Sequence, residues 1–89
     1  MTHTLYITWV KQGTVQWEEW YTKRYGNKLQ KLPNMNDHIS FANFDLKNNQ
    51  CSTITKEEDS LVIRGVPEEK LRLAASILAY HGFSILDVK

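Results

Sequence analysis

Residues 60–88 read SLVIRGVPEEKLRLAASILAYHGFSILDV, and this stretch decides the fold class. It opens with an apolar run, Leu61 to Ile63, which is typical of a buried strand. Pro67 fits the first position of a helix, and the two glutamates that follow it complement the positive end of the helix dipole. The stretch therefore predicts a strand over residues 60–66 that leads directly into a helix.

This helix has the clearest pattern in the chain. Its apolar residues recur at helical spacing and are Leu71, Ala74, Ala75 and Leu78. Gly82 is expected to end the helix, with Phe83 placed to pack back on it, and residues 83–88 predict a final strand. Strand, helix and strand in this order predict a βαβ unit, with a right-handed crossover and both strands parallel in one sheet.

The N-terminal part of the chain predicts a strand and then a second helix. Thr4 to Val10 alternates apolar and polar side chains, as a strand with one buried face does. Residues 14–26 fit two structures. As a helix, they begin at the N-cap Thr14, end at Gly26 and gather their aromatic residues on one face. As a strand, they place aromatic residues at even spacing. We favour the helix.

The middle of the chain carries weaker signals. Residues 27–37 are rich in Asn, Asp and Pro, which predicts an irregular connection. Residues 38–46 alternate apolar side chains, with one slip, and predict a second strand. After a turn at Asn48-Asn49, residues 50–55 are expected to pair back on that strand as a hairpin. The charged run Lys56 to Asp59 predicts another turn.

Together these elements predict one small α+β domain that spans residues 1–89. The order β-α-β-β-α-β, or a close variant of it, is the ferredoxin-like plan. In this two-layer sandwich the helices cover one face of an antiparallel-rich sheet. The opposite face of the sheet would then be open to solvent or to a partner.

The composition indicates a globular protein of the cytoplasm. Of the 89 residues, 42% are hydrophobic and 24% are charged, which is ordinary for a folded domain. Cys51 is the only cysteine, so a disulfide within the chain is excluded and a reducing compartment is expected. No signal-peptide pattern or apolar run of membrane-spanning length is visible. Residues 1–36 carry a net charge of +3 and residues 37–89 carry −2, so a bipolar molecule is expected.

No catalytic or cofactor-binding pattern stands out in the sequence. His3, His38, His81 and Cys51 lack the short spacings of zinc ligands. The four glycines are isolated and give no phosphate-binding loop. His81 is expected to cap a helix, and Cys51 is expected to be structural because nothing near it in sequence would activate its thiol. The sequence thus predicts a protein that is not an enzyme and has no metal or cofactor.

The unusual feature is the aromatic segment WEEWYTKRY at residues 17–25. Core packing accounts for most of its aromatic residues, but a helix does not easily bury all of them, so one Trp is expected at the surface. Exposed Trp or Tyr beside Arg and Lys is typical of the energetic centres of protein interfaces. We therefore expect two partner-binding groups: an anchor for an acidic or aromatic partner, and an acidic group for a basic partner. The anchor comprises Trp17, Trp20, Lys23 and Arg24, and the acidic group comprises Glu57, Glu58 and Asp59.

Residues 5–9 read LYITW, and Thr14, Trp17, Glu18-Glu19 and the run YTKRYG of residues 21–26 follow. This pattern resembles the opening of the cloacin-type immunity proteins, small cytoplasmic antidotes that bind the nuclease domain of ribosome-cutting bacteriocins. The resemblance implies an inhibitor of a toxin, and it also implies loop and strand over residues 14–25. That family is strongly acidic and has no counterpart of the βαβ unit, so no contact residue is carried over.

Two functional hypotheses follow. The first is a non-enzymatic protein-binding module, best described as an immunity or inhibitor protein that covers the active surface of a toxin or another macromolecular enzyme. The second is binding of RNA or single-stranded nucleic acid on the open sheet face. Residues 5–10 loosely resemble the first strand motif of RNA-recognition domains, and residues 40–44 resemble part of the second. The balanced charge disfavours this hypothesis, because phosphate contacts dominate such binding.

Overall fold

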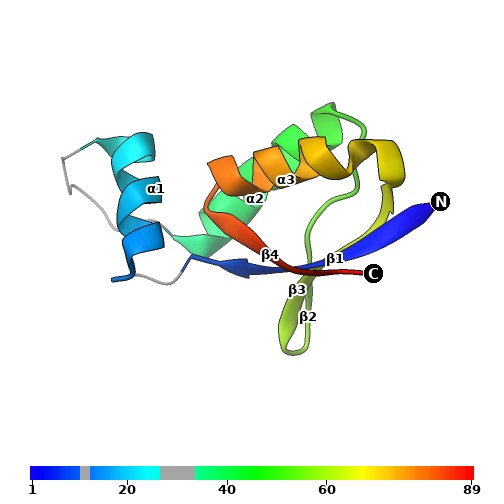
Figure 1. Cartoon of the computed structure of the whole chain (residues 1–89), viewed down its shortest axis with the longest axis horizontal. Coiled ribbons are helices and arrows are strands. Elements are labelled where there is room, and N and C mark those ends of the chain that lie inside the picture. The colour runs from blue at the N-terminus through cyan, green and yellow to red at the C-terminus, as the bar shows by residue number, and fades with distance from the viewer. Residues whose placement is uncertain (11–12, 27–33) are drawn as a thin grey trace.

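The computed structural model describes residues 1–10, 13–26 and 34–89. Its strands form one sheet in the order β2-β3-β1-β4, in which every neighbouring pair is antiparallel (Figure 1). The protein is a small α+β domain. In chain order its elements are β1 (Thr2–Trp9), α1 (Val15–Tyr25), α2 (Met35–Asn48), β2 (Thr55–Glu57), β3 (Ser60–Pro67), a 3-10 turn (Glu68–Lys70), α3 (Leu71–Tyr80) and β4 (Phe83–Val88).

The stretch of residues 60–88 folds as its sequence predicts. β3 and β4 both run antiparallel to β1, so they are parallel to each other, and β1 lies between them. Ala74 and Leu78 of α3 are fully buried against the sheet, beside Leu5 and Ile63 of the two central strands. The predicted βαβ unit is therefore present, with its two strands separated by the N-terminal strand.

Helix α1 is also present, as the capping signals predict. The side chain of Thr14 accepts a hydrogen bond from the backbone N–H of Trp17 at 3.2 Å, and Gly26 ends the helix at φ +72°. That positive φ is accessible to glycine because it has no Cβ. The loop and strand that the family resemblance implied for residues 14–25 are not found.

The strand predicted for residues 38–46 is wrong, because these residues belong to helix α2. The side chain of Asn34 caps the helix by accepting from the N–H groups of Asn36 and Asp37. The residues buried in α2 recur every four positions and are His38, Ala42 and Leu46. The apparent alternation came from aromatic residues, Phe41 and Phe44, that face outward.

The predicted hairpin was placed too early in the chain. Residues 50–55 do not pair with residues 38–46; instead, the backbone of Ile54 is held to α2 by the side-chain amide of Asn43, at 2.7 Å and 3.3 Å. The hairpin pairs β2 with β3, and its turn is Glu58-Asp59. In the predicted connection 27–37, residues 27–33 lie outside the described residues, and residues 35–37 begin α2.

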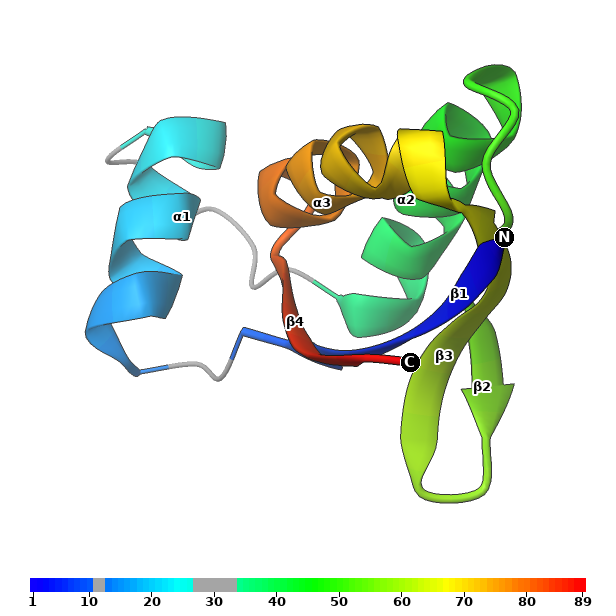
Figure 2. The same ribbon diagram turned by 45° about the vertical axis from the view of Figure 1, so that its right-hand side comes forward.

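The helices α2 and α3 cover one face of the sheet, while α1 stands beyond the sheet, at the end where β1 finishes and β4 begins (Figures 1 and 2). Two hydrophobic clusters result. The main core lies between the sheet and the helices α2 and α3, and a smaller cluster contains Trp17, Trp20 and Tyr21 of α1. Trp9, the last residue of β1, packs against both clusters and links them. In the described part of the chain, no helix has the length and apolar character needed to span a membrane.

Candidate functional site

The predicted acidic group lies at the tip of the β2–β3 hairpin. Glu57 accepts two hydrogen bonds from the guanidinium of Arg64, at 2.7 Å and 2.8 Å, and this pairing lowers the pKa of Glu57. Glu58 and Asp59 form the exposed turn and make no ion pair with any described residue. The hairpin thus presents two free carboxylates next to one that is already satisfied.

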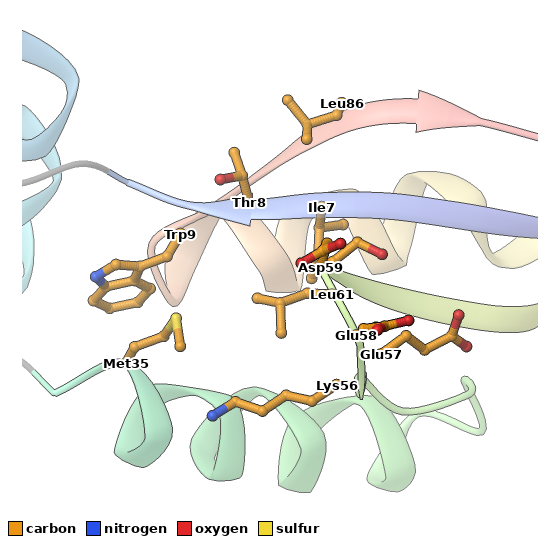
Figure 3. Close-up of a pocket in the computed structure, with 11 residues that line it drawn as sticks. Ile7, Thr8, Trp9, Met35, Lys56, Glu57, Glu58, Asp59, Leu61 and Leu86 are labelled. Carbon is orange, nitrogen blue, oxygen red and sulfur yellow. The ribbon is translucent and has the colours of Figure 1, made fainter.

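A groove of about 470 Å³ opens beside this hairpin (Figure 3). Trp9 comes from the end of β1, Met35 from the start of α2 and Leu61 from β3, and all three are partly buried. Lys56 reaches across to α2, where its Nζ donates to the side-chain oxygen of Asn36 at 2.6 Å. Among the residues that the structure describes, the groove therefore has apolar walls and an acidic rim, and its one cation, Lys56, already has a partner.

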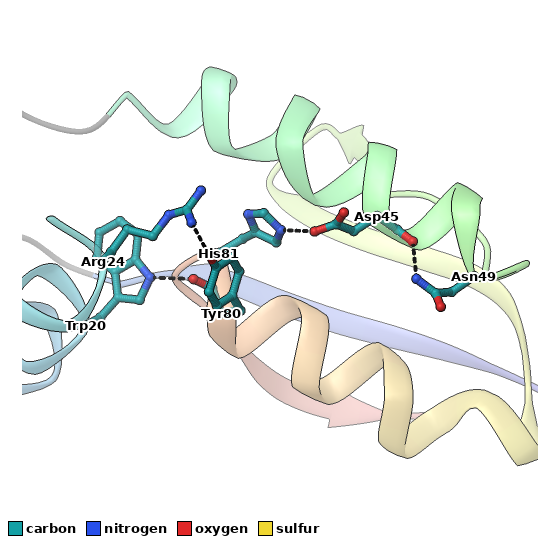
Figure 4. A network of polar contacts seen from close by, with 6 residues as sticks. All are labelled: Trp20, Arg24, Asp45, Asn49, Tyr80 and His81. Atoms are coloured by element: carbon teal, nitrogen blue, oxygen red, sulfur yellow. Dashed lines mark hydrogen bonds and ion pairs between the residues drawn. The ribbon is translucent and has the colours of Figure 1, made fainter.

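The predicted anchor on α1 is only partly at the surface. Trp17 and Trp20 are buried, with 8% and 9% of their surface exposed, so the expectation of an exposed Trp in this segment is wrong. Trp20 donates from Nε1 to the backbone carbonyl of Tyr80 at 2.9 Å (Figure 4). Arg24 donates to the Tyr80 hydroxyl and lies 4.5 Å from the centre of that ring. The two Trp side chains hold α1 together and in place, while Lys23 is exposed.

His38 packs beside Trp20 and Tyr25 of α1. It is a buried histidine that the sequence did not single out as a site. The rings of Trp9, Trp20 and Phe41 surround it, and its Nε2 lies 2.5 Å from the hydroxyl of Tyr25. Burial lowers the pKa of His38, and the positive charges of neighbouring Arg24 and His81 lower it further, against the raising effect of Asp37. At neutral pH the imidazole is therefore uncharged.

A second buried histidine joins α3 to α2. Nε2 of His81 lies 2.6 Å from a carboxylate oxygen of Asp45 (Figure 4). His81 is also the residue at the C-terminus of α3, where its backbone N–H donates to the carbonyls of Ile77 and Leu78, in line with the capping role that was predicted. The Nδ1 atoms of His38 and His81 are both buried, and Nε2 of each already lies within hydrogen-bond distance of a side chain, the Tyr25 hydroxyl and the Asp45 carboxylate respectively.

Cys51 has a similarly inert setting. The side chain is buried, and its sulfur lies 3.8 Å from the backbone carbonyl of Asn49. Burial raises the pKa of the Cys51 thiol, which disfavours the reactive thiolate. This environment agrees with a structural role.

The surface next to His38 is unusually aromatic. Tyr25, Phe41, Phe44 and Tyr80 expose 41%, 49%, 67% and 57% of their surfaces, and we call these four residues the aromatic patch. Contacts connect three of them: Phe41 packs on His38, Nε2 of His38 lies within hydrogen-bond distance of the Tyr25 hydroxyl, and the Arg24 guanidinium lies near the rings of Tyr25 and Tyr80. Phe44 follows Phe41 by three positions on α2. Aromatic side chains from three helices are therefore exposed in this region, and two of them, Tyr25 and Tyr80, flank Arg24.

The sheet face opposite the helices offers less to nucleic acid than the sequence suggested. Residues 40–44, which were compared with an RNA-binding strand, lie in α2 and not in the sheet. Tyr6 of β1 lies on the open face with Lys89 Nζ 5.2 Å from its ring centre, but Arg64 is engaged by Glu57 and Lys89 lies 3.9 Å from Asp87. The cations near Tyr6 thus already have acidic neighbours.

The described residues contain no candidate metal site, and comparisons with known proteins find no relative. Among the residues that the structure describes, no group of three or more His, Cys, Asp or Glu side chains is arranged to hold a metal ion. The candidate site therefore consists of two surfaces, the aromatic patch and the acidic groove. No family model, curated protein or solved structure matches this chain.

Proposed function

We propose that this protein is a non-enzymatic protein-binding module that inhibits a toxin or another macromolecular enzyme by covering its active surface. The observation that carries the proposal is the aromatic patch. Large apolar side chains exposed together on a small domain mark interaction surfaces, and aromatic residues around an arginine are the composition of interface hot spots. Arg24 joins the sequence-predicted anchor to this patch.

The size of the domain suits this mode of action. A standard interface covers about 800 Å² on each partner, and the chain has an accessible surface of 6082 Å². One face of the molecule is therefore enough. The buried positions of His38, His81 and Cys51 also favour a role in which surface complementarity, and not a reacting group, does the work.

Three further assignments belong to the same proposal. The fold is a ferredoxin-like sandwich, which is supported by the strand order and by the crossover of residues 60–88; the first crossover then contains two helices in place of one. The cytoplasm is its compartment, supported by the single free cysteine. An immunity protein is the preferred class of inhibitor, supported by the resemblance of residues 5–26.

Substitution of the patch tests the proposal. The double variant Phe41→Ser, Phe44→Ser is expected to weaken binding to the native partner by about 1,000-fold, because each aromatic ring at a hot spot contributes about 2 kcal/mol. The partner is captured from host cells with the purified protein, the complex is reconstituted at one-to-one stoichiometry, and its Kd is measured by calorimetry. Inhibition of the partner's own activity is measured in parallel.

The matched control is Val15→Ser, Leu73→Ser, which removes two exposed apolar side chains outside the patch. It should bind like the unmodified chain, and thermal melts establish that both variants are folded. Failure to recover a stoichiometric protein partner would count against the proposal. So would salt-sensitive binding to mixed oligonucleotides, or turnover of a substrate that is lost when His38, His81 or Cys51 is replaced.

A further inference from the structure

We infer that the groove beside the β2–β3 hairpin binds a short basic segment of a partner protein, which places an apolar side chain on the groove walls and a Lys or Arg against Glu58 and Asp59. The inference rests on the proposed protein-binding function, but it concerns a different surface from the aromatic patch. The two surfaces share no residue: the patch comes from the three helices, whereas the groove lies between the hairpin, the end of β1 and the start of α2.

The walls of the groove supply the apolar part of the recognition. A volume of about 470 Å³ falls within the range of roughly 300–1,000 Å³ that ligand-binding clefts occupy. Trp9, Met35 and Leu61 are each only partly buried, so an apolar side chain seated between them removes their remaining surface from water. Figure 3 shows these three side chains converging from separate elements.

The charge of the rim decides which segment fits. Four charged side chains of the described residues line the groove, and two of them are already engaged: Lys56 with Asn36, and Glu57 with Arg64. The remaining two, Glu58 and Asp59, carry negative charge at the exposed turn and make no ion pair with a described residue. An acidic segment would be repelled there, whereas a Lys or Arg gains a partner without displacing one.

The geometry of the hairpin supports a fixed site. Arg64 holds Glu57 from the neighbouring strand with a two-point contact, and Lys56 ties the hairpin to α2. Because both strands of the hairpin are held in this way, the turn that carries the two free carboxylates keeps its position over the groove. A basic segment then meets a preformed arrangement of charges and apolar walls, which limits the entropy cost of binding.

A displayed library of random short peptides tests the inference with the full chain as the target. Selected peptides are expected to contain Lys or Arg close to an apolar residue, and their binding is expected to weaken as salt is added. The variant Glu58→Lys, Asp59→Lys should weaken their affinity by about tenfold or more. The control Glu18→Lys, Glu19→Lys makes the same change of net charge on the exposed face of α1 and should leave the affinity unchanged.

Two results would overturn the inference. One is a selection that yields no basic peptides; the other is a set of basic peptides that bind the hairpin variant as well as the unmodified chain. A third measurement distinguishes rejection of the basic segment from rejection of the proposed protein-binding function. If the native partner is lost with Phe41→Ser, Phe44→Ser but is retained at full affinity with Glu58→Lys, Asp59→Lys, the protein-binding function stands and the basic segment is rejected.

Discussion

Replacing Gly82 with alanine is expected to lower the free energy of unfolding by about 2–5 kcal/mol. Gly82 ends α3 at φ +92°, a conformation that costs a residue with a side chain about 1–2 kcal/mol. A Cβ at this position would also lie 2.8 Å from Cε2 of Trp20 and 3.0 Å from Cζ3 of Trp9. Trp20 cannot easily retreat, because its Nε1 is bonded to the carbonyl of Tyr80. Steric overlap therefore adds to the backbone strain.

Gly65→Ala is the matched control for this substitution. Gly65 also has a positive φ, +74°, but a Cβ there would meet only the hydroxyl of Ser52, at 3.6 Å. Gly65→Ala should therefore lower the free energy of unfolding by about 1–2 kcal/mol, which is the cost of the backbone strain alone. Urea unfolding, followed by Trp fluorescence and circular dichroism, measures both variants. Equal destabilisation by the two substitutions would contradict the close approach of Trp20 and Trp9 to Gly82.

Acidification is expected to destabilise the protein through His38. Because its pKa is lowered in the folded state from an ordinary value of 6.5, the unfolded chain binds a proton at a higher pH than the folded protein does. The contribution of His38 to stability is thus complete above pH 6.5 and is lost as the pH falls from there through the folded pKa. Each unit by which the pKa is lowered corresponds to about 1.4 kcal/mol.

The variant His38→Phe isolates this effect, because phenylalanine keeps a ring among Trp9, Trp20 and Phe41 but does not titrate. Urea unfolding of both proteins is measured at several pH values above and below 6.5. The unmodified chain should lose more stability than the variant over this range. Parallel curves would show that His38 is not the group responsible.

Gly82→Ala and protonation of His38 both act on the contact between α1 and the rest of the domain. This contact also positions part of the proposed partner-binding surface. Gly82 provides the space for Trp20, and His38 holds the hydroxyl of Tyr25. Tyr25, which belongs to the aromatic patch, and Arg24, which lies beside Tyr80, hold these positions only while α1 is packed against the rest of the domain. Gly82→Ala and low pH are therefore also expected to weaken partner binding, although neither change replaces a residue of the patch.

Local signals in the sequence predicted the secondary structure correctly where the residues fit one kind of element better than another. The apolar run followed by helical spacing fixed β3 and α3, and at residues 14–26, which fit both a helix and a strand, the caps at Thr14 and Gly26 favoured the helix that is found. They failed at residues 38–46, where apolar residues fit a period of two almost as well as a helical period. The signal that could have decided the matter was Asn34 followed by Asp37, a helix N-cap with an acidic first turn.

The candidate sites show the same division. The sequence alone identified the acidic run at residues 57–59 and the aromatic segment at residues 17–25, and both lie at or beside a candidate surface. Only the tertiary structure decided that Trp20 is buried, that Phe41 and Phe44 are exposed, and that His38 lies among aromatic residues of β1, α1 and α2. The physical reason is that the exposure of a side chain and its contacts depend on how separate elements pack against one another. The groove, for example, brings together residues 9, 35 and 58, which no local sequence pattern links.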